Sequence, residues 1–184
     1  MNNNIFNASL PSQSSIGRLF VKSFTAFIML SIAMLIFKQP MIISLFIILG
    51  IISMYPIKHI NWLGVELCFF FTVFTSMQFG AIPGIIVASM ILIITGVIYD
   101  LIGVNFAYEL IAFFIIAVFS SFFNIIYIAS IGMLLLILYH VGSAIFQKTM
   151  SMFDFESILF MLTNISFNMF ILFRIAPYIV KILT

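Results

Sequence analysis

The sequence carries very little charge for its length. Only 7% of its 184 residues are Asp, Glu, Lys or Arg, whereas 65% are hydrophobic. A soluble domain needs roughly a quarter of its residues charged to build a water-facing surface, so this composition excludes a soluble globular protein. The lipid bilayer must be the solvent for most of the molecular surface. We therefore predict an all-α, polytopic membrane protein.

Cysteine, histidine and clustered basic residues are also scarce. The single cysteine, Cys68, excludes an intramolecular disulfide and lies in an apolar run, which is typical of a small core residue. Two isolated histidines give no metal-ligand spacing, and no known catalytic or nucleotide-binding motif occurs. A net charge of +2 without a basic cluster argues against a nucleic-acid partner. We expect no cofactor, no metal site and no enzymatic activity.

Long apolar runs dominate what the sequence does contain. A helix needs about 20 apolar residues to cross the hydrocarbon core, and Pro, Gly and charged residues mark the breaks. The run 108–147 would form a helix about 60 Å long at 1.5 Å per residue, so it must fold back, and Asn124 is the expected turn. The predicted apolar helices are 19–37, 41–55, 62–78, 82–99, two within 108–147, and 157–182.

The expected organisation is one membrane domain behind a short polar lead. Residues 1–18 are polar and aperiodic, which predicts disorder, and residues 19–184 form a single transmembrane helical domain. The domain has seven spans if every run crosses and six if one run is shallow. We favour six, with 41–55 or 62–78 as the run that does not cross.

The distribution of basic residues supports this choice. With six spans both termini lie on the same side, and the basic residues near them share the cytoplasmic face, as the positive-inside tendency prefers. We therefore expect a multi-pass protein of the cell (inner) membrane with cytoplasmic termini. The basic residues concerned are Arg18, Lys22, Arg174 and Lys181.

Small residues recur at multiples of four along the run 82–99 and the turn before it. Gly80, Gly84, Ala88 and Gly96 lie along one slowly drifting helix face. Without large side chains, a second helix can approach this face closely, which is how helices associate in lipid. Two interpretations remain: packing inside the chain's own bundle, or a docking face for another membrane subunit.

A few polar side chains interrupt the apolar runs and are the candidates for binding a substrate. A carboxylate within a span is costly, so it faces a cavity, a partner or the interface. Amides one turn apart favour interhelical hydrogen bonds or ligand contacts. An ion pair between Glu66 and Arg174 is an alternative for that carboxylate. The candidate substrate-binding residues are Glu66, Glu109, Asn124, Asn164 and Asn168.

The region 61–183 resembles two groups of small six-helix membrane proteins. It combines a polar-tipped apolar helix opening at 61–66 with a small-residue helix ending at Asp100 and an asparagine-bearing last helix. These features are similar to the substrate-binding S components of energy-coupling factor vitamin transporters and to MreD-like rod-shape-determining proteins. The column of Gly80, Gly84 and Ala88 matches their G-x-x-x-G-x-x-x-G pattern with Ala in the third place.

The two resemblances imply different functions. An S component would capture a small vitamin-like molecule or metal ion in a cavity between helices, for an ATP-driven partner to move. An MreD-like protein, or an accessory subunit of a larger complex, would bind membrane partners and no substrate. S components typically carry an Ala-x-x-x-Ala patch on the first helix, whereas Ala26 and Ala33 here lie seven apart. A polar-dotted cavity is the feature expected to separate the two.

Overall fold

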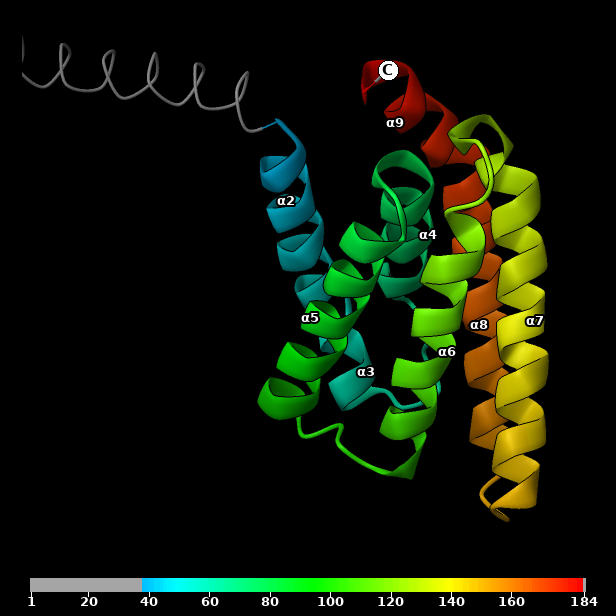
Figure 1. Cartoon of the computed structure of the whole chain (residues 1–184). Coiled ribbons are helices and arrows are strands. Elements are labelled where there is room, and N and C mark those ends of the chain that lie inside the picture. Colours follow the sequence, from blue (N-terminus) through cyan, green and yellow to red (C-terminus); the bar gives the residue numbers. More distant parts are fainter. Residues whose placement is uncertain (1–37, 184) are drawn as a thin grey trace, which may run out of the picture. The chain divides into compact units, whose positions relative to one another are not determined.

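The computed structural model describes residues 38–183 (Figure 1). The predicted polar lead and the predicted first span at 19–37, with Ala26 and Ala33, lie outside the described residues. Residues 42–184 form one compact unit, and residues 1–41 belong to another. The helix Lys38–Ser53 begins in the first unit and continues into the second, and all later helices belong to the second.

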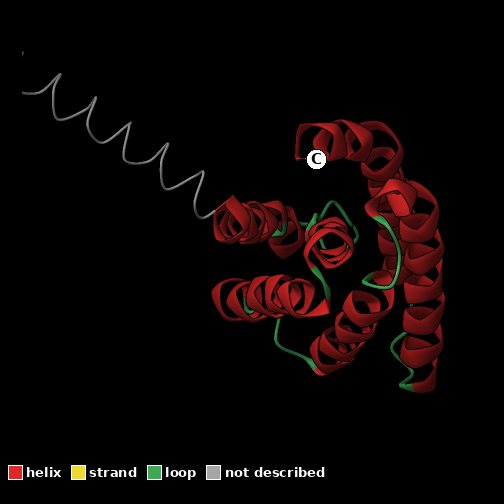
Figure 2. Ribbon diagram, turned by 45° about the horizontal axis from the view of Figure 1, so that its top comes forward, coloured by secondary structure: helices red, strands yellow, loops and turns green. Residues whose placement is uncertain are grey.

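The described residues form helices and loops without a strand, which confirms the all-α prediction (Figure 2). Apolar runs bounded by Pro, Gly and polar residues set most of the helix ends, as the sequence pattern predicts. The elements are α2 (Lys38–Ser53), α3 (Tyr55–His59), α4 (Cys68–Phe79), α5 (Ala81–Tyr99), α6 (Val104–Ser120), the 3₁₀ turn η1 (Ile125–Tyr127), α7 (Ile128–Thr149), α8 (Phe155–Phe170), the π-helical turn η2 (Ile171–Ile175) and α9 (Ala176–Leu183).

Four helical segments of the described chain are long and apolar enough to cross a bilayer. The run at 41–55 is part of a longer segment of 22 residues, and α4 and α6 are apolar but shorter. At 1.5 Å per residue, the 12 residues of α4 reach about 18 Å, less than the hydrocarbon thickness. A six-span bundle is therefore not confirmed. The four long segments are Lys38–His59, Ala81–Tyr99, Ile125–Thr149 and Phe155–Ile182.

The short helix α4 lies at the centre of the unit. It contacts α5, α6 and α7, and nine consecutive residues from Cys68 to Ser76 are buried. A helix that is apolar on all sides needs protein around its whole circumference, and α4 finds it there. Its phenylalanines Phe69, Phe70 and Phe74 form the middle of the core. The neighbouring elements are thus arranged around α4.

The helix expected at 62–78 begins only at Cys68, so this part of the prediction is wrong. Residues 60–67 instead run as irregular chain along α8. The Gly64 amide donates to Thr163 Oγ1 at 2.8 Å, and a Cβ on Gly64 would lie 2.6 Å from the Phe160 carbonyl oxygen. Irregular backbone inside a membrane protein is tolerated where protein groups satisfy it. Side chains of α8 satisfy this segment.

The small-residue column packs against helices of the same chain. A Cβ on Gly84 would overlap the Ser76 hydroxyl of α4, so close approach of α4 and α5 requires glycine there. A Cβ on Gly96 would lie 3.0 Å from the Phe106 ring of α6, and Ala88 between them is buried. Gly80 forms the α4–α5 turn with a φ of 98°, a left-handed conformation that favours glycine. The column therefore brings α4, α5 and α6 together.

Two breaks in the C-terminal half have local causes. The long apolar run folds back where predicted, because α6 ends at Ser120 and the Asn124 side chain accepts a hydrogen bond from the Ile126 amide at the start of η1. Further on, Pro177 lacks the N–H that would donate to the Phe173 carbonyl in a regular α-helix. The wide turn η2 lies just before it, and Figure 1 shows α9 bending away from α8 there.

Candidate functional site

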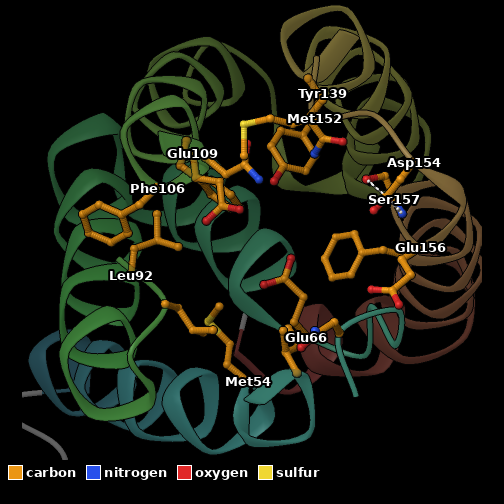
Figure 3. A pocket seen from close by; sticks show the side chains of 17 residues that line it. Met54, Glu66, Leu92, Phe106, Glu109, Tyr139, Met152, Asp154, Glu156 and Ser157 are labelled. Atoms are coloured by element: carbon orange, nitrogen blue, oxygen red, sulfur yellow. Dashed lines mark hydrogen bonds between the residues drawn. The ribbon is translucent and has the colours of Figure 1, made fainter. Parts of the chain in front are cut away.

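A cavity of about 390 Å³ lies at the end of the unit where α5 ends, α6 begins, and α7 turns into α8. Its walls come from α3, the irregular segment 60–67, α5, α6, α7, α8 and the α7–α8 loop (Figure 3). This volume falls within the range of small-molecule sites. No single pair of helices forms the cavity. Eight residues separate the end of α3 from the start of α4, and the space that a longer α4 would fill is lined by side chains of the surrounding elements.

Acidic side chains dominate the polar part of the lining. Glu66, Glu109, Asp154 and Glu156 are four of the five acidic residues in the whole sequence. No lysine, arginine or histidine is among the residues that line the cavity in the described part of the chain. Figure 3 shows the Glu66 and Glu109 carboxyl groups turned toward the hollow from different elements. The cavity therefore contains most of the protein's side-chain carboxyl groups.

The four carboxyl groups are graded in burial from the mouth inward. Asp154 and Glu156, at the start of α8, are exposed; Glu109 on α6 is half-buried; and Glu66 is only 4% exposed. Exposed charges at the mouth of a cleft attract ions of opposite charge. The carboxyl groups thus form a series of decreasing exposure from the solvent to Glu66.

Asp154 at the mouth caps α8. Its Oδ1 accepts hydrogen bonds from the Ser157 amide at 2.8 Å and the Ser157 hydroxyl at 2.7 Å. These bonds stabilise the carboxylate, and the first of them, from the backbone, is the main reason that the pKa of Asp154 lies below its ordinary value. Asp154 therefore holds negative charge at the mouth across the physiological pH range.

Glu66 is held from behind by a buried amide network. Asn164 Nδ2 donates to Glu66 Oε1 at 3.1 Å, and Asn168 Nδ2 lies 3.4 Å from the Glu66 carbonyl and 3.1 Å from Asn164 Oδ1. His140 Nε2 lies 2.9 Å from the same Asn164 oxygen. Because Asn164 Oδ1 can only accept, the His140 Nε2 must carry a hydrogen in this arrangement. The network fixes one side of the Glu66 carboxyl and leaves the other toward the cavity.

Several acceptors in the wall have no donor among the described residues. No hydrogen bond or ion pair to Glu109 is found there, and only one of the two Glu66 carboxyl oxygens receives a hydrogen bond. The amide oxygens of Asn105 and Gln147, both in the wall, are buried without a partner in the same part of the chain. Buried acceptors normally find donors, so these oxygens are available to N–H or O–H groups of a ligand.

Aromatic side chains complete the lining. Phe106, Phe113, Tyr139 and Phe160 face the cavity from α6, α7 and α8. The Phe113 and Tyr139 rings meet edge to face with centroids 5.4 Å apart, which fixes both rings. An apolar, aromatic wall with a few fixed polar groups is the usual composition of a small-molecule site.

The structure separates the predicted site residues into three groups. Glu66 and Glu109 line the cavity, and Asn164 and Asn168 lie behind Glu66 and hold it. Asn124 lies elsewhere, at the opposite end of the unit, where it caps η1. Glu66 and Glu109 are therefore placed to contact a ligand, whereas Asn164 and Asn168 are placed to support Glu66.

Glu66 does not pair with Arg174, and two acidic residues of the cavity were not predicted. Arg174 is exposed on η2, and the Glu66 carboxyl bonds to Asn164 instead, so the Glu66–Arg174 ion pair does not form. Asp154 and Glu156 were not among the predicted site residues. They lie in the charged segment 148–156, which is typical of a solvated loop. The available signal was an acidic residue three positions before Ser157 at the start of an apolar run, which is typical of a helix N-cap.

Among the described residues, no group of three or more His, Cys, Asp and Glu side chains is placed to hold a metal ion. No protein family, no curated protein and no solved structure matches this chain.

Proposed function

We propose that this chain is the substrate-binding subunit of a small-molecule transporter in the cell membrane. The observation that carries the proposal is the cavity of about 390 Å³, walled by five helices and the segments between them and lined by both aromatic and polar side chains. A binding subunit needs such a hollow, and a resemblance to the S components of vitamin transporters implies one. The aromatic walls supply contact area, and the fixed carboxyl groups supply orientation.

The alternative proposal is a scaffold or accessory subunit without a substrate. That function favours a solid interior and a small-residue column turned toward lipid, ready for a partner helix. In this chain Gly84 and Gly96 face Ser76 and Phe106 of the same unit. The observed cavity and the covered column both support substrate binding over scaffolding.

The proposed orientation places the mouth of the cavity outside the cytoplasm. Arg174 and Lys181 lie at the C-terminal end of the unit, which we assign to the cytoplasm because the proposed uptake needs a mouth that opens outside the cell. The mouth lies at the other end, where Lys58 and Lys148 accompany the acidic residues of the α7–α8 loop. With this orientation the cavity receives its ligand from outside the cell, as uptake requires.

The test is native mass spectrometry of the full chain, purified from its own membranes in lipid nanodiscs. Asn105→Trp fills the cavity from the start of α6, whereas Val104→Trp places the same side chain at an exposed position one residue away. The expected result is a bound small molecule on the wild type and on Val104→Trp, absent from Asn105→Trp.

Two results would contradict the proposal. One is equal small-molecule occupancy in Asn105→Trp and Val104→Trp, which would put the ligand outside the cavity. The other is wild-type protein that carries no small molecule but copurifies with a stoichiometric membrane partner, which supports the scaffold alternative.

A further inference from the structure

We propose that the cavity takes a small organic cation: an ammonium or guanidinium compound with an aromatic or apolar body. The inference rests on the proposed substrate-binding function and names the chemical class of the ligand. Three independent features of the cavity carry it, namely its acidic side chains, its unpaired hydrogen-bond acceptors and its aromatic walls.

The charged groups around the cavity have one sign. The ionisable side chains that line it are four carboxyl groups and the Tyr139 phenol, and no lysine is among the described lining residues. Lys58 on α3 lies 5.9 Å from the Tyr99 ring centroid, and Lys148 on α7 is exposed and outside the lining. The His140 Nε2 atom on α7 lies within hydrogen-bond distance of Asn164 Oδ1. In the described part of the chain, no basic side chain lines the cavity beside Glu66 and Glu109.

The unpaired acceptor oxygens of the wall also favour a ligand that donates hydrogen bonds. Glu66 is 4% exposed and keeps one carboxyl oxygen without a donor in the described chain. The amide oxygens of Asn105 and Gln147 are likewise without partners there. An ammonium group offers three N–H donors and a guanidinium offers five, and neither accepts. A carboxylate ligand offers only acceptors, which cannot bond to these unpaired oxygens.

The geometry favours an organic cation over a metal ion. A hard metal ion needs several oxygen ligands close together, and no three acidic, histidine or cysteine side chains in the described residues are grouped for this. The cavity is also far larger than an ion, and the half-buried Phe106 and Phe160 rings contribute apolar wall area. Aromatic faces attract organic cations by the cation–π interaction. The aromatic and carboxyl groups of the wall thus suit one molecule with an apolar body and a cationic group.

The experiment compares three probes of the same shape and different charge: phenylethylammonium, 2-phenylethanol and phenylacetate. Each is titrated into the full chain in nanodiscs, and the dissociation constant is measured at neutral pH and low salt. The cation is expected to bind at least tenfold more tightly than the alcohol, and phenylacetate is expected to bind weakest.

Two variants assign this preference to the cavity. Glu109→Gln removes a carboxylate that makes no hydrogen bond in the described chain, so it should leave folding intact and weaken the cation roughly tenfold to a hundredfold, the effect of losing one charge-assisted hydrogen bond. Asp100→Asn is the matched control, because Asp100 is exposed, lies outside the lining and has a left-handed backbone that Asn tolerates. Its affinity for the cation should equal that of the wild type.

The inference is overturned if the alcohol or phenylacetate binds as tightly as the cation, if none of the three binds, or if Glu109→Gln and Asp100→Asn have equal effects. A neutral or anionic molecule copurified with the wild type overturns the cation class while the binding function stands. Absence of any small molecule from the wild type overturns both.

Discussion

At the scale of single residues, Glu66 shows why a mostly apolar chain keeps a buried acid. A carboxyl group so far from water needs hydrogen bonds on every side that the protein controls. Asn164 provides one such bond, and Asn168 and His140 hold Asn164 in turn. The arrangement is asymmetric, since the support comes only from the α8 side. The free side of the carboxyl is what makes Glu66 a candidate for ligand contact.

Asn164→Leu tests this support. The substitution keeps the volume but leaves Glu66 Oε1 and the His140 Nε2 hydrogen without their partner in a buried place. We expect a loss of about 2–4 kcal/mol in the free energy of unfolding, measured by denaturant titration in detergent micelles. Ser166→Ala, an exposed position on the same helix, is the control and should change little. Equal stability of both variants would contradict the network.

Asp154 gives a dependence on pH at the cavity mouth. Its pKa in the folded protein lies below the ordinary value of 3.8, so capping of α8 is fully present above that value and is lost as the pH falls through the lowered pKa. Hydrogen-exchange protection of the first turn of α8 should therefore fall below about pH 4 in the wild type. Asp154→Asn, which caps without ionising, should show no such step. An identical step in both proteins would rule out Asp154 as its cause.

At the residue scale, burial of charge was the signal by which the sequence indicated candidate site residues. Glu66 and Glu109 interrupt apolar runs, and an ionisable group in such a run is expected to face a cavity, a partner or the interface. Asp154 and Glu156 gave no such signal, because they lie in a charged segment and only the turn from α7 into α8 brings them beside Glu66 and Glu109. Convergence of this kind depends on how helices are placed, which spacing along the chain does not contain.

At the scale of elements, the segment 60–67 decides the architecture. Its composition is that of a helix, and sequence periodicity alone predicts one. The outcome depends on Thr163, whose hydroxyl oxygen accepts from the Gly64 amide and lies 3.1 Å from the Trp62 carbonyl. These partners are about 100 positions apart in the sequence. The irregular conformation is therefore a tertiary effect, whereas helix ends at Pro and Gly are local and were predictable.

Gly64→Ala tests the seam between this segment and α8. The new methyl group would lie 2.6 Å from the Phe160 carbonyl oxygen, a backbone atom that cannot turn away. We expect a loss of roughly 1–3 kcal/mol in stability, as for other overpacked sites, and stronger acrylamide quenching of Trp62, the single tryptophan.

Gly103→Ala is the matched control for this prediction. A Cβ at Gly103 meets nothing within 4 Å, and its backbone is extended, so the variant should behave as the wild type. If Gly64→Ala and Gly103→Ala have the same stability and the same Trp62 quenching, residues 60–67 do not pack against α8 as described.

At the scale of the whole unit, long and short helices have different roles. The four long segments are the candidates for crossing the bilayer, whereas α4 is too short to do so, and α6, with 17 residues, is at the lower limit of length. Because α4 begins late, phenylalanines pack the middle of the unit around α4, and the acidic cavity lies at the end where α7 meets α8. The cavity is thus a consequence of helix length, and side chains then give it charge.

The proposed orientation is tested by thiol labelling of intact cells. The native Cys68 is fully buried, so it should contribute little background. With the mouth outside and the C terminus in the cytoplasm, Glu156→Cys should react with an impermeant maleimide in intact cells. Lys181→Cys should react only after the membrane is permeabilised. The reverse pattern would place the mouth in the cytoplasm.

The central claim, an acidic cavity that accepts a cation, is tested most directly by the charge preference of a thiol placed in its wall. Gln147→Cys keeps all four carboxyl groups, and Val104→Cys is the exposed reference outside the cavity. The measurement is the rate of modification by a cationic and by an anionic methanethiosulfonate reagent, each divided by its rate with a free thiol. We predict that the cationic reagent modifies Gln147→Cys at least tenfold faster, with no such preference at Val104→Cys. Equal rates for the two reagents at Gln147→Cys, or no reaction with either, would contradict the account.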